Sequence, residues 1–256
     1  MTTRSKPCIR YLKHRRRREV ELKVGDVPVA VRRKAIKHMH LYVEPPDGSV
    51  LVSAPKEASD EEVLFFVREN FGWVLRQRNG MLAQRRQPPR KYISGETHYL
   101  WGEQYFLELV KQDGWGGIKI SGNALTMLAP LESTEKSRRD YMTEWERSLL
   151  SDAVNRALPL WEKRTGLNVQ RFSIMNMRRS WGKCNPEKES IIFNLQLVRK
   201  PKEALNYIIL HELCHLKTRT HGKEFIALMD RFMPNWREVR KRLNDSPLDC
   251  DGNRGQ

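Results

Sequence analysis

The stretch YIILHELCHLKTRTHGKEF, residues 207–225, places three histidines and a glutamate close together in the chain. The segment leading into it begins with Pro201 and Glu203, and both a proline and a carboxylate favour the first turn of a helix. Apolar residues recur along the predicted helix, which indicates that it is largely buried. Polar side chains on a buried helix need partners, so the histidines and the glutamate require an explanation.

The spacing of these polar residues predicts a metal site. His211 and His215 are four positions apart, so on a helix both imidazoles project from one face, one turn from each other. Glu212 is offset by one position and can reach a water molecule on the metal without being a ligand. This is the H-E-x-x-H arrangement, in which two nitrogens bind Zn²⁺ and the carboxylate acts as general base. The alternative is a histidine pair satisfied by hydrogen bonds in the core.

A catalytic zinc site needs a third protein ligand and an open position. His221 is the nearest candidate, and it reaches the other two histidines only if the helix ends between them. Two threonines disfavour the helix there and Gly222 permits a turn. We therefore expect the chain to turn back and present His221 to the metal. Cys214 points to another face and is expected to be a small core residue.

The rest of the sequence predicts an α+β fold. Alternating apolar and polar residues separated by turn signals predict antiparallel strands in VPVAVRR, HMHLYVE and SVLVSAP. Ser59 and Glu62 form a capping box that begins a helix, and two more hairpins are predicted before residue 130. A long helix over residues 133–165 follows, with Pro159 kinking or splitting it.

Two strands, VQRFSIMNM and SIIFNLQLV, are predicted ahead of the histidine helix, and two helices after it. The expected divisions are a basic arm at 1–24, a β-rich α+β domain at 25–130, a catalytic domain at 131–245 and a tail at 246–256.

The chain of 256 residues carries 47 Lys and Arg against 31 Asp and Glu, a formal net charge of +16. Such a surplus attracts nucleic acid, nucleotides or acidic membrane surface, although a basic surface without such a partner is the alternative. The four cysteines form no C-x-x-C pair, which argues against a disulfide framework or a cysteine zinc finger. No signal peptide and no apolar stretch of membrane-spanning length is present, so we expect a cytoplasmic protein without a membrane partner.

The segment HELCHLKTRTHGKEF resembles the YgjP-like metal-dependent hydrolases, relatives of the SprT-like and WLM zinc metallopeptidases. The segments RRSWGKCN, IIFNLQLVRKPKEALNYIILHEL and FMPNWREVRKRLN are similar to that family as well, as are the N-terminal strands and the hairpin GETHYLWGEQYFLEL. The resemblance implies a small β-rich domain followed by a minimal zincin-type metallopeptidase domain. It also implies His211, His215 and His221 as zinc ligands and Glu212 as the catalytic base.

The sequence departs from the family pattern around the site but not in the metal ligands. Ser180 stands where an arginine is usual, Lys183 replaces a serine, and Gly222 replaces the serine after the third ligand. The strand facing the substrate is therefore expected to have an altered preference.

Three functions remain open on the sequence. The first is a zinc-dependent peptidase acting on polypeptides, with a variant that cleaves proteins held on DNA. The second is a nucleotide pyrophosphatase of the UTP type, because activated water also attacks phosphorus; three histidines, however, suit zinc better than Mg²⁺. The third is a DNA-associated protein-binding module with structural zinc, although structural sites usually use four protein ligands. Candidate substrate-binding residues are Arg178, Arg179, Trp181 and Asn194.

Overall fold

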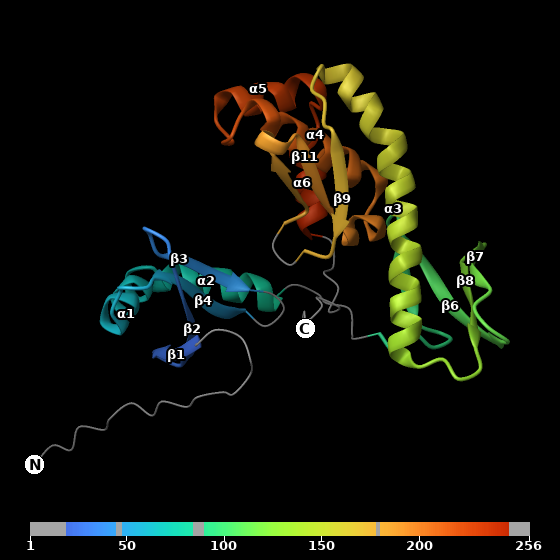
Figure 1. Cartoon of the computed structure of the whole chain (residues 1–256), viewed down its shortest axis with the longest axis horizontal. Coiled ribbons are helices and arrows are strands. Elements are labelled where there is room, and N and C mark those ends of the chain that lie inside the picture. Colours follow the sequence, from blue (N-terminus) through green and yellow to red (C-terminus); the bar gives the residue numbers. More distant parts are fainter. Residues whose placement is uncertain (1–18, 45–47, 84–89, 178–179, 246–256) are drawn as a thin grey trace, which may run out of the picture. The chain divides into compact units, whose positions relative to one another are not determined.

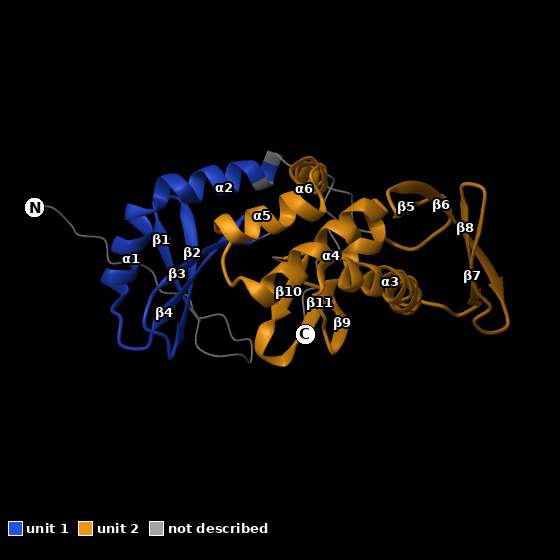
Figure 2. Ribbon diagram, turned by 90° about the horizontal axis from the view of Figure 1, so that it is seen from above, with its two compact units in different colours: residues 1–85 blue, residues 86–256 orange. Residues whose placement is uncertain are grey.

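The computed structural model describes residues 19–44, 48–83, 90–177 and 180–245, and the chain divides into two units, residues 1–85 and 86–256 (Figure 2). The architecture is a mixture of helices and β-sheets, as the sequence predicted. The expected arm falls outside the described residues except for its last part, and the expected tail lies outside them entirely. In the described residues, no helix is both long enough and apolar enough to cross a membrane.

The first unit is a four-stranded sheet with two helices packed on it (Figure 1). Its elements are β1 (Glu19–Val24), β2 (Val27–Lys34), β3 (His40–Glu44), β4 (Ser49–Pro55), α1 (Asp60–Glu69) and α2 (Phe71–Ala83). Valines on the strands meet valines on both helices in one hydrophobic cluster. The predicted capping box at the start of α1 is present, with the Ser59 backbone N–H donating to the Glu62 carboxylate at 2.7 Å.

Two features of this unit differ from the prediction. The strand order is β1-β2-β4-β3, and β2 pairs with β4 in parallel, so the prediction of antiparallel strands is wrong for that pair. The reason is that two antiparallel hairpins lie side by side, which leaves their second strands running the same way. The strand β1 also occupies residues that sequence analysis assigned to the arm, since EVELKV alternates and pairs with β2.

The second unit begins with another four-stranded sheet, which the helix α3 follows. Its strands are β5 (Thr97–Leu100), β6 (Glu103–Gln112), β7 (Gly117–Ser121) and β8 (Ala124–Pro130), in the order β5-β6-β8-β7. The helix α3 (Glu135–Thr165) runs unbroken through Pro159 and ends at Gly166, whose left-handed backbone suits glycine. The predicted split at Pro159 is therefore not observed.

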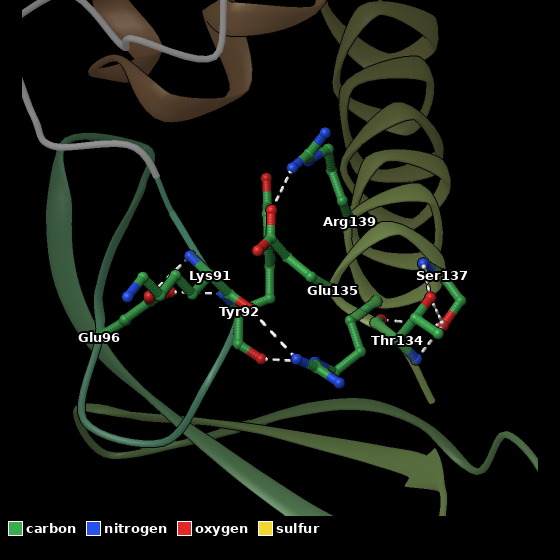
Figure 3. Close-up of polar contacts among 8 residues, drawn as sticks. Lys91, Tyr92, Glu96, Thr134, Glu135, Ser137 and Arg139 are labelled. Carbon is green, nitrogen blue, oxygen red and sulfur yellow. Dashed lines mark hydrogen bonds and ion pairs between the residues drawn. The ribbon is translucent and has the colours of Figure 1, made fainter. Parts of the chain in front are cut away.

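Polar contacts fix the start of α3 against the sheet (Figure 3). Thr134 and Ser137 form a reciprocal capping pair at the first turn. On the segment before β5, the Glu96 carboxylate accepts the Tyr92 backbone N–H at 2.7 Å, and the buried Arg138 of α3 donates to the Tyr92 carbonyl at 2.7 Å. These bonds satisfy buried polar groups while joining helix and sheet.

A three-stranded sheet and three helices complete the second unit (Figure 1). They are β9 (Arg171–Met175), β10 (Gly182–Asn185), β11 (Ser190–Asn194), α4 (Lys202–Lys217), α5 (Lys223–Phe232) and α6 (Trp236–Asp245), with short 3₁₀ turns at Pro186–Lys188 and Leu195–Arg199. The order is β10-β11-β9, so the predicted strand SIIFNLQLV is central and ends early. The edge strand β10 has no alternating pattern that indicated it, and only the family resemblance implied a strand there.

The second sheet packs into the same unit as the helices that follow it, whereas sequence analysis placed a domain boundary at residue 130. Leu100 belongs to the hydrophobic cluster that includes α4. The Trp101 backbone N–H donates to the Val198 carbonyl at 2.7 Å. The buried carboxylate of Glu146 on α3 accepts two bonds of 2.8 Å from the guanidinium of Arg199, which precedes α4. The sheet β5–β8 and α3 thus support the helix that carries the histidines.

Candidate metal centre

The histidine helix α4 is enclosed by the core of the second unit. Pro201 precedes its first residue and Glu203 lies in its first turn. Most of its length is buried, and its buried residues are Ala204, Leu205, Tyr207, Ile208, Ile209, Leu210, Glu212, Leu213 and Cys214. Cys214 contacts Met229 through sulfur at 3.8 Å, in line with the core role expected for it.

The structure brings the three histidines together. His211 and His215 lie one turn apart on α4, and the chain leaves the helix at Thr218, where the backbone becomes extended. His221 lies in the bend before α5, and its ring centroid is 4.9 Å from that of His211 and 4.8 Å from that of His215. The candidate ligand atoms of the three residues all lie within 4.8 Å of one another.

Gly222 has a different role from the one expected for it. Its φ of −75° is accessible to any residue, so the turn does not depend on glycine there. Gly222 instead occupies the N-cap position of α5, where no side-chain hydrogen bond caps the helix.

Two contacts orient the rings on α4. The Nδ1 atom of His215 lies 2.9 Å from the carbonyl oxygen of Thr218. Because a carbonyl can only accept, Nδ1 carries the proton and Nε2 is left with a free lone pair. The Tyr207 hydroxyl lies 3.4 Å from Nδ1 of His211. Contacts of this kind fix the orientation of metal-binding imidazoles in proteins.

Phe225 forms an apolar base behind the three rings. Its side chain is 1% exposed. Its ring centroid lies 4.6 to 5.0 Å from those of His211, His215 and His221. An apolar backing limits water access on that side and leaves the other side for a ligand.

The donor set fits a tetrahedral metal ion. Nitrogen ligands at about 2.0–2.1 Å from zinc are roughly 3.3 Å apart in tetrahedral geometry. The Nε2 atoms of His211 and His221 are 3.1 Å apart, which is close to that separation. Three neutral imidazoles suit zinc among the common biological metals, and three protein ligands leave a fourth position open.

The environment favours the neutral form of the His211 and His221 imidazoles, which is the form that binds a metal. Burial, followed by the charges of His215, His221 and Arg240, lowers the pKa of His211 to about 3. Burial also lowers the pKa of His221, with smaller effects from the charges of His215 and Arg240.

Glu212 is 5% exposed and lies between α4 and the edge strand β10. Burial raises the pKa of its carboxyl group to about 7, and a hydrogen bond from the Cys184 backbone N–H acts in the opposite direction. Gly182 on β10 leaves the space for this carboxylate, because a Cβ atom there would lie 2.4 Å from Oε1. A carboxyl group with a pKa near 7 is matched to proton transfer at neutral pH.

The structure describes two of the four candidate substrate-binding residues, Trp181 and Asn194, and they differ in their surroundings. Trp181 is partly buried against the core and lines a cavity beside His211 and Glu212. Asn194 is 4% exposed, and its side chain donates to the carbonyls of Met177 and Ser180, each at 2.8 Å. Its Oδ1 accepts the Gln196 backbone N–H at 3.2 Å.

Asn194 therefore holds the segment leading to β10 and has its polar atoms engaged within the protein. Arg178 and Arg179 lie outside the described residues.

Sequence reasoning missed several residues around the site. Tyr207 could have been found, because it precedes His211 by one helical turn. Phe225 was part of the quoted stretch, but nothing in its spacing distinguished it from an ordinary core aromatic. Gly182, Cys184 and Arg240 come from β10 and α6, and no local pattern shows that these elements meet α4.

Comparison with known proteins places this architecture in a family. A family model described as YgjP-like, metallopeptidase domain, matches residues 37–246. No curated protein matches the sequence. The structure of the metallopeptidase zymogen of Pyrococcus abyssi abylysin is 22% identical, with a TM-score of 0.33 over 35% of this chain and 90% of that chain. The zymogen of Methanocaldococcus jannaschii jannalysin is 21% identical, with a TM-score of 0.33 over 36% of this chain and 87% of that chain. Since the family model spans most of the sequence, the chain belongs to the YgjP-like metallopeptidase family.

Proposed function

We propose that the protein is a zinc-dependent peptidase in which His211, His215 and His221 hold the metal and Glu212 is the general base. The observation that carries the proposal is the convergence of three ring nitrogens from α4 and the bend after it, with a buried carboxylate one residue from the first ligand. Membership of a metallopeptidase family supports a polypeptide substrate and a metal ion.

The chemistry that a bound zinc supplies is Lewis-acid polarisation and acidification of water. The protein's own groups do the rest. The Thr218 carbonyl holds the proton of His215 on Nδ1, which keeps Nε2 available as a ligand. Glu212 accepts a proton from the attacking water at its carboxylate and returns it to the leaving amine. Phe225 keeps water away from the inner side of the rings.

The edge strand β10 supports the binding of an extended peptide. Among the described residues it pairs only with β11, and it faces α4 beside Glu212. Extended peptides commonly bind by adding a strand to such an edge. The other two sequence-based functions gain no comparable support: the family match favours neither a nucleotide pyrophosphatase nor a DNA-associated module with structural zinc.

The test compares the zinc-loaded protein with its Glu212→Gln variant. Each is incubated with denatured protein, duplex DNA and nucleoside triphosphates, and products are identified by mass spectrometry. We expect peptide products that fall by at least about 100-fold in the variant, because general base catalysis contributes roughly 10²–10⁴-fold. Glu203→Gln, on the same helix but paired with Arg242 at the surface, is the matched control and should retain activity. Nucleoside mono- or diphosphate products that depend on Glu212 would contradict the proposal.

A second variant reaches the same carboxylate without replacing it. Gly182→Ala puts a Cβ only 2.4 Å from Oε1 of Glu212, which is too close for a real contact, and forces that side chain to move. We expect a large loss of activity with zinc content unchanged, measured by metal analysis of the purified protein. Loss of zinc together with activity would instead show that the substitution disturbs the histidines.

A further inference from the structure

A cavity of about 200 Å³ opens beside His211 and Glu212. Its walls come from three elements: the start of β10 with Trp181 before it, the middle of α4 with Tyr207, and one face of α6 with Arg240. The cavity therefore adjoins the candidate metal centre and lies within the second unit.

Arg240 gives this cavity a cationic wall. The three arginines of α6 differ in their partners: Arg237 pairs with Asp230, and Arg242 pairs with Glu203. Across the described ranges, Arg240 has no acidic partner. Its side chain also lines the cavity together with His211 and Glu212. A guanidinium that has no acidic partner among the described residues, and that lies beside the candidate metal centre, can bind a carboxylate.

The size of the cavity limits what it can hold. Sites for drug-sized ligands usually have volumes of about 300–1,000 Å³, and this one is smaller. It suits a single amino-acid side chain better than a nucleoside triphosphate. Trp181 and Ile208 offer apolar surface to the stem of such a side chain, and Arg240 offers a bidentate donor to its end.

We propose that this cavity is a substrate subsite for an acidic side chain close to the scissile bond, and that Arg240 binds its carboxylate. The inference rests on the proposed peptidase function and adds the class of substrate. A second hollow of about 440 Å³ shares Arg240 and also includes Lys241.

Binding measurements test the subsite without relying on cleavage. Zinc-loaded Glu212→Gln protein is titrated into fluorescent peptides that differ only by Glu or Gln at one position, with that position scanned along the peptide. We expect at least one position at which Glu binds about tenfold more tightly than Gln, the effect of one charge-assisted hydrogen-bonded pair. Adding Arg240→Gln should remove that difference, and Arg240→Glu should make Lys the preferred residue there.

The matched control is Lys241→Gln, which removes the same charge from the neighbouring residue, outside the smaller cavity. It should leave most of the Glu preference in place. The inference is overturned if Glu and Gln peptides bind equally at every position, or if Lys241→Gln removes the preference as fully as Arg240→Gln. Binding of duplex DNA or UTP that depends on Arg240, with no such dependence for peptides, would also overturn it.

Cleavage assays separate the inference from the proposed function. Wild-type protein that cleaves peptides with no preference for acidic residues would leave the peptidase function standing and refute the subsite. Protein that binds acidic peptides through Arg240 but cleaves none would support the subsite and refute the peptidase function.

Discussion

The sheet β1–β4 and the sheet β5–β8 follow the same path, two antiparallel hairpins joined through a parallel pair of second strands. Their surroundings differ. The first sheet packs against α1 and α2 in a hydrophobic cluster of its own. The second sheet packs against α3 in one cluster and contributes Leu100 to another, which includes the histidine helix. One path of the chain thus builds a self-contained unit in one place and part of the support of a candidate active site in the other.

Removing one partner of an ion pair should give the largest difference between the two units in the free energy of unfolding. Arg199 and Glu146 have side chains 8% and 4% exposed, whereas Arg33 and Asp60 of the first unit are 27% and 46% exposed. Removing one partner of a buried pair costs about 3–5 kcal/mol, and an exposed pair contributes about 1 kcal/mol at most. We therefore expect Glu146→Gln to lower the free energy of unfolding of the second unit by about 3–5 kcal/mol. Asp60→Asn should change the first unit by under about 1 kcal/mol.

Hydrogen exchange of the full chain in increasing urea, read by mass spectrometry, assigns each loss to its unit. Similar falls in the free energy of unfolding for the two variants would contradict this prediction. They would mean that the buried ion pair stabilises the second unit no more than the exposed ion pair stabilises the first.

Zinc should stabilise only one of the two units. A ligand at 100 times its dissociation constant stabilises the state that binds it by about 2.7 kcal/mol. We expect added zinc to raise the free energy of unfolding of residues 86–256 by this amount and to leave β1–β4 unchanged. The same hydrogen-exchange experiment, with and without a chelator, measures both. Equal protection of the two units by zinc would contradict the proposed ligands.

The first hairpin turn of each four-stranded sheet contains a glycine, Gly25 between β1 and β2 and Gly102 between β5 and β6. Gly25 and Gly102 both have positive φ, so alanine costs roughly 1 kcal/mol in strain at either position. A Cβ at Gly25 would lie 3.9 Å from Phe71, an ordinary contact, but at Gly102 it would lie 2.9 Å from Pro201 at the start of α4. We expect Gly102→Ala to cost about 1–3 kcal/mol more than Gly25→Ala because of this overpacking.

Urea denaturation of both variants measures the difference, and zinc affinity should fall for Gly102→Ala alone. Equal costs would show that the turn at Gly102 can move without disturbing α4.

Helix starts give the smallest effect. In the first unit α1 has a complete capping box at Ser59, whereas α5 starts at Gly222 without a side-chain cap. A Cβ at Gly222 would meet only Thr220, at an ordinary 3.7 Å. Gly222→Ser should therefore stabilise the protein by a few tenths of a kcal/mol, and Ser59→Gly should destabilise it by a similar amount. Thermal unfolding checks both, and a destabilised Gly222→Ser would show that the bend carrying His221 does not tolerate a side chain.

Local patterns predicted the parts of the structure that depend on local physics. The capping box at Ser59, the long helix ending at Gly166 and the histidine helix ending ahead of His221 all follow from residue types at fixed spacings. The pairing of β2 with β4 depends on how two hairpins meet, which no short segment specifies. For the same reason, no local pattern indicated that the second sheet belongs to the unit that carries the histidine helix.

The residues of the candidate site also fall into two groups, those that local spacing predicted and those that only tertiary packing brings together. The three histidines and Glu212 come from one continuous stretch, so their spacing alone indicated that they meet. The surroundings of Glu212 come from β10, which is four residues long and lacks an alternating apolar pattern. Arg240 follows Trp236 by four positions and precedes Leu243 by three on α6. Periodicity therefore places it near the buried face, but only the packing of α6 on α4 brings it to the cavity.

The end of α4 sets a limit on how this protein can be re-engineered. A common way to raise thermal stability is to lengthen a helix by replacing poor helix formers after its last turn. Here the residue at which α4 stops, Thr218, supplies the carbonyl that orients His215. Continuing the helix through this position would turn that carbonyl along the helix axis and carry His221 away from the other two rings. The helix end that a stability design would extend first is therefore the end that the proposed site requires.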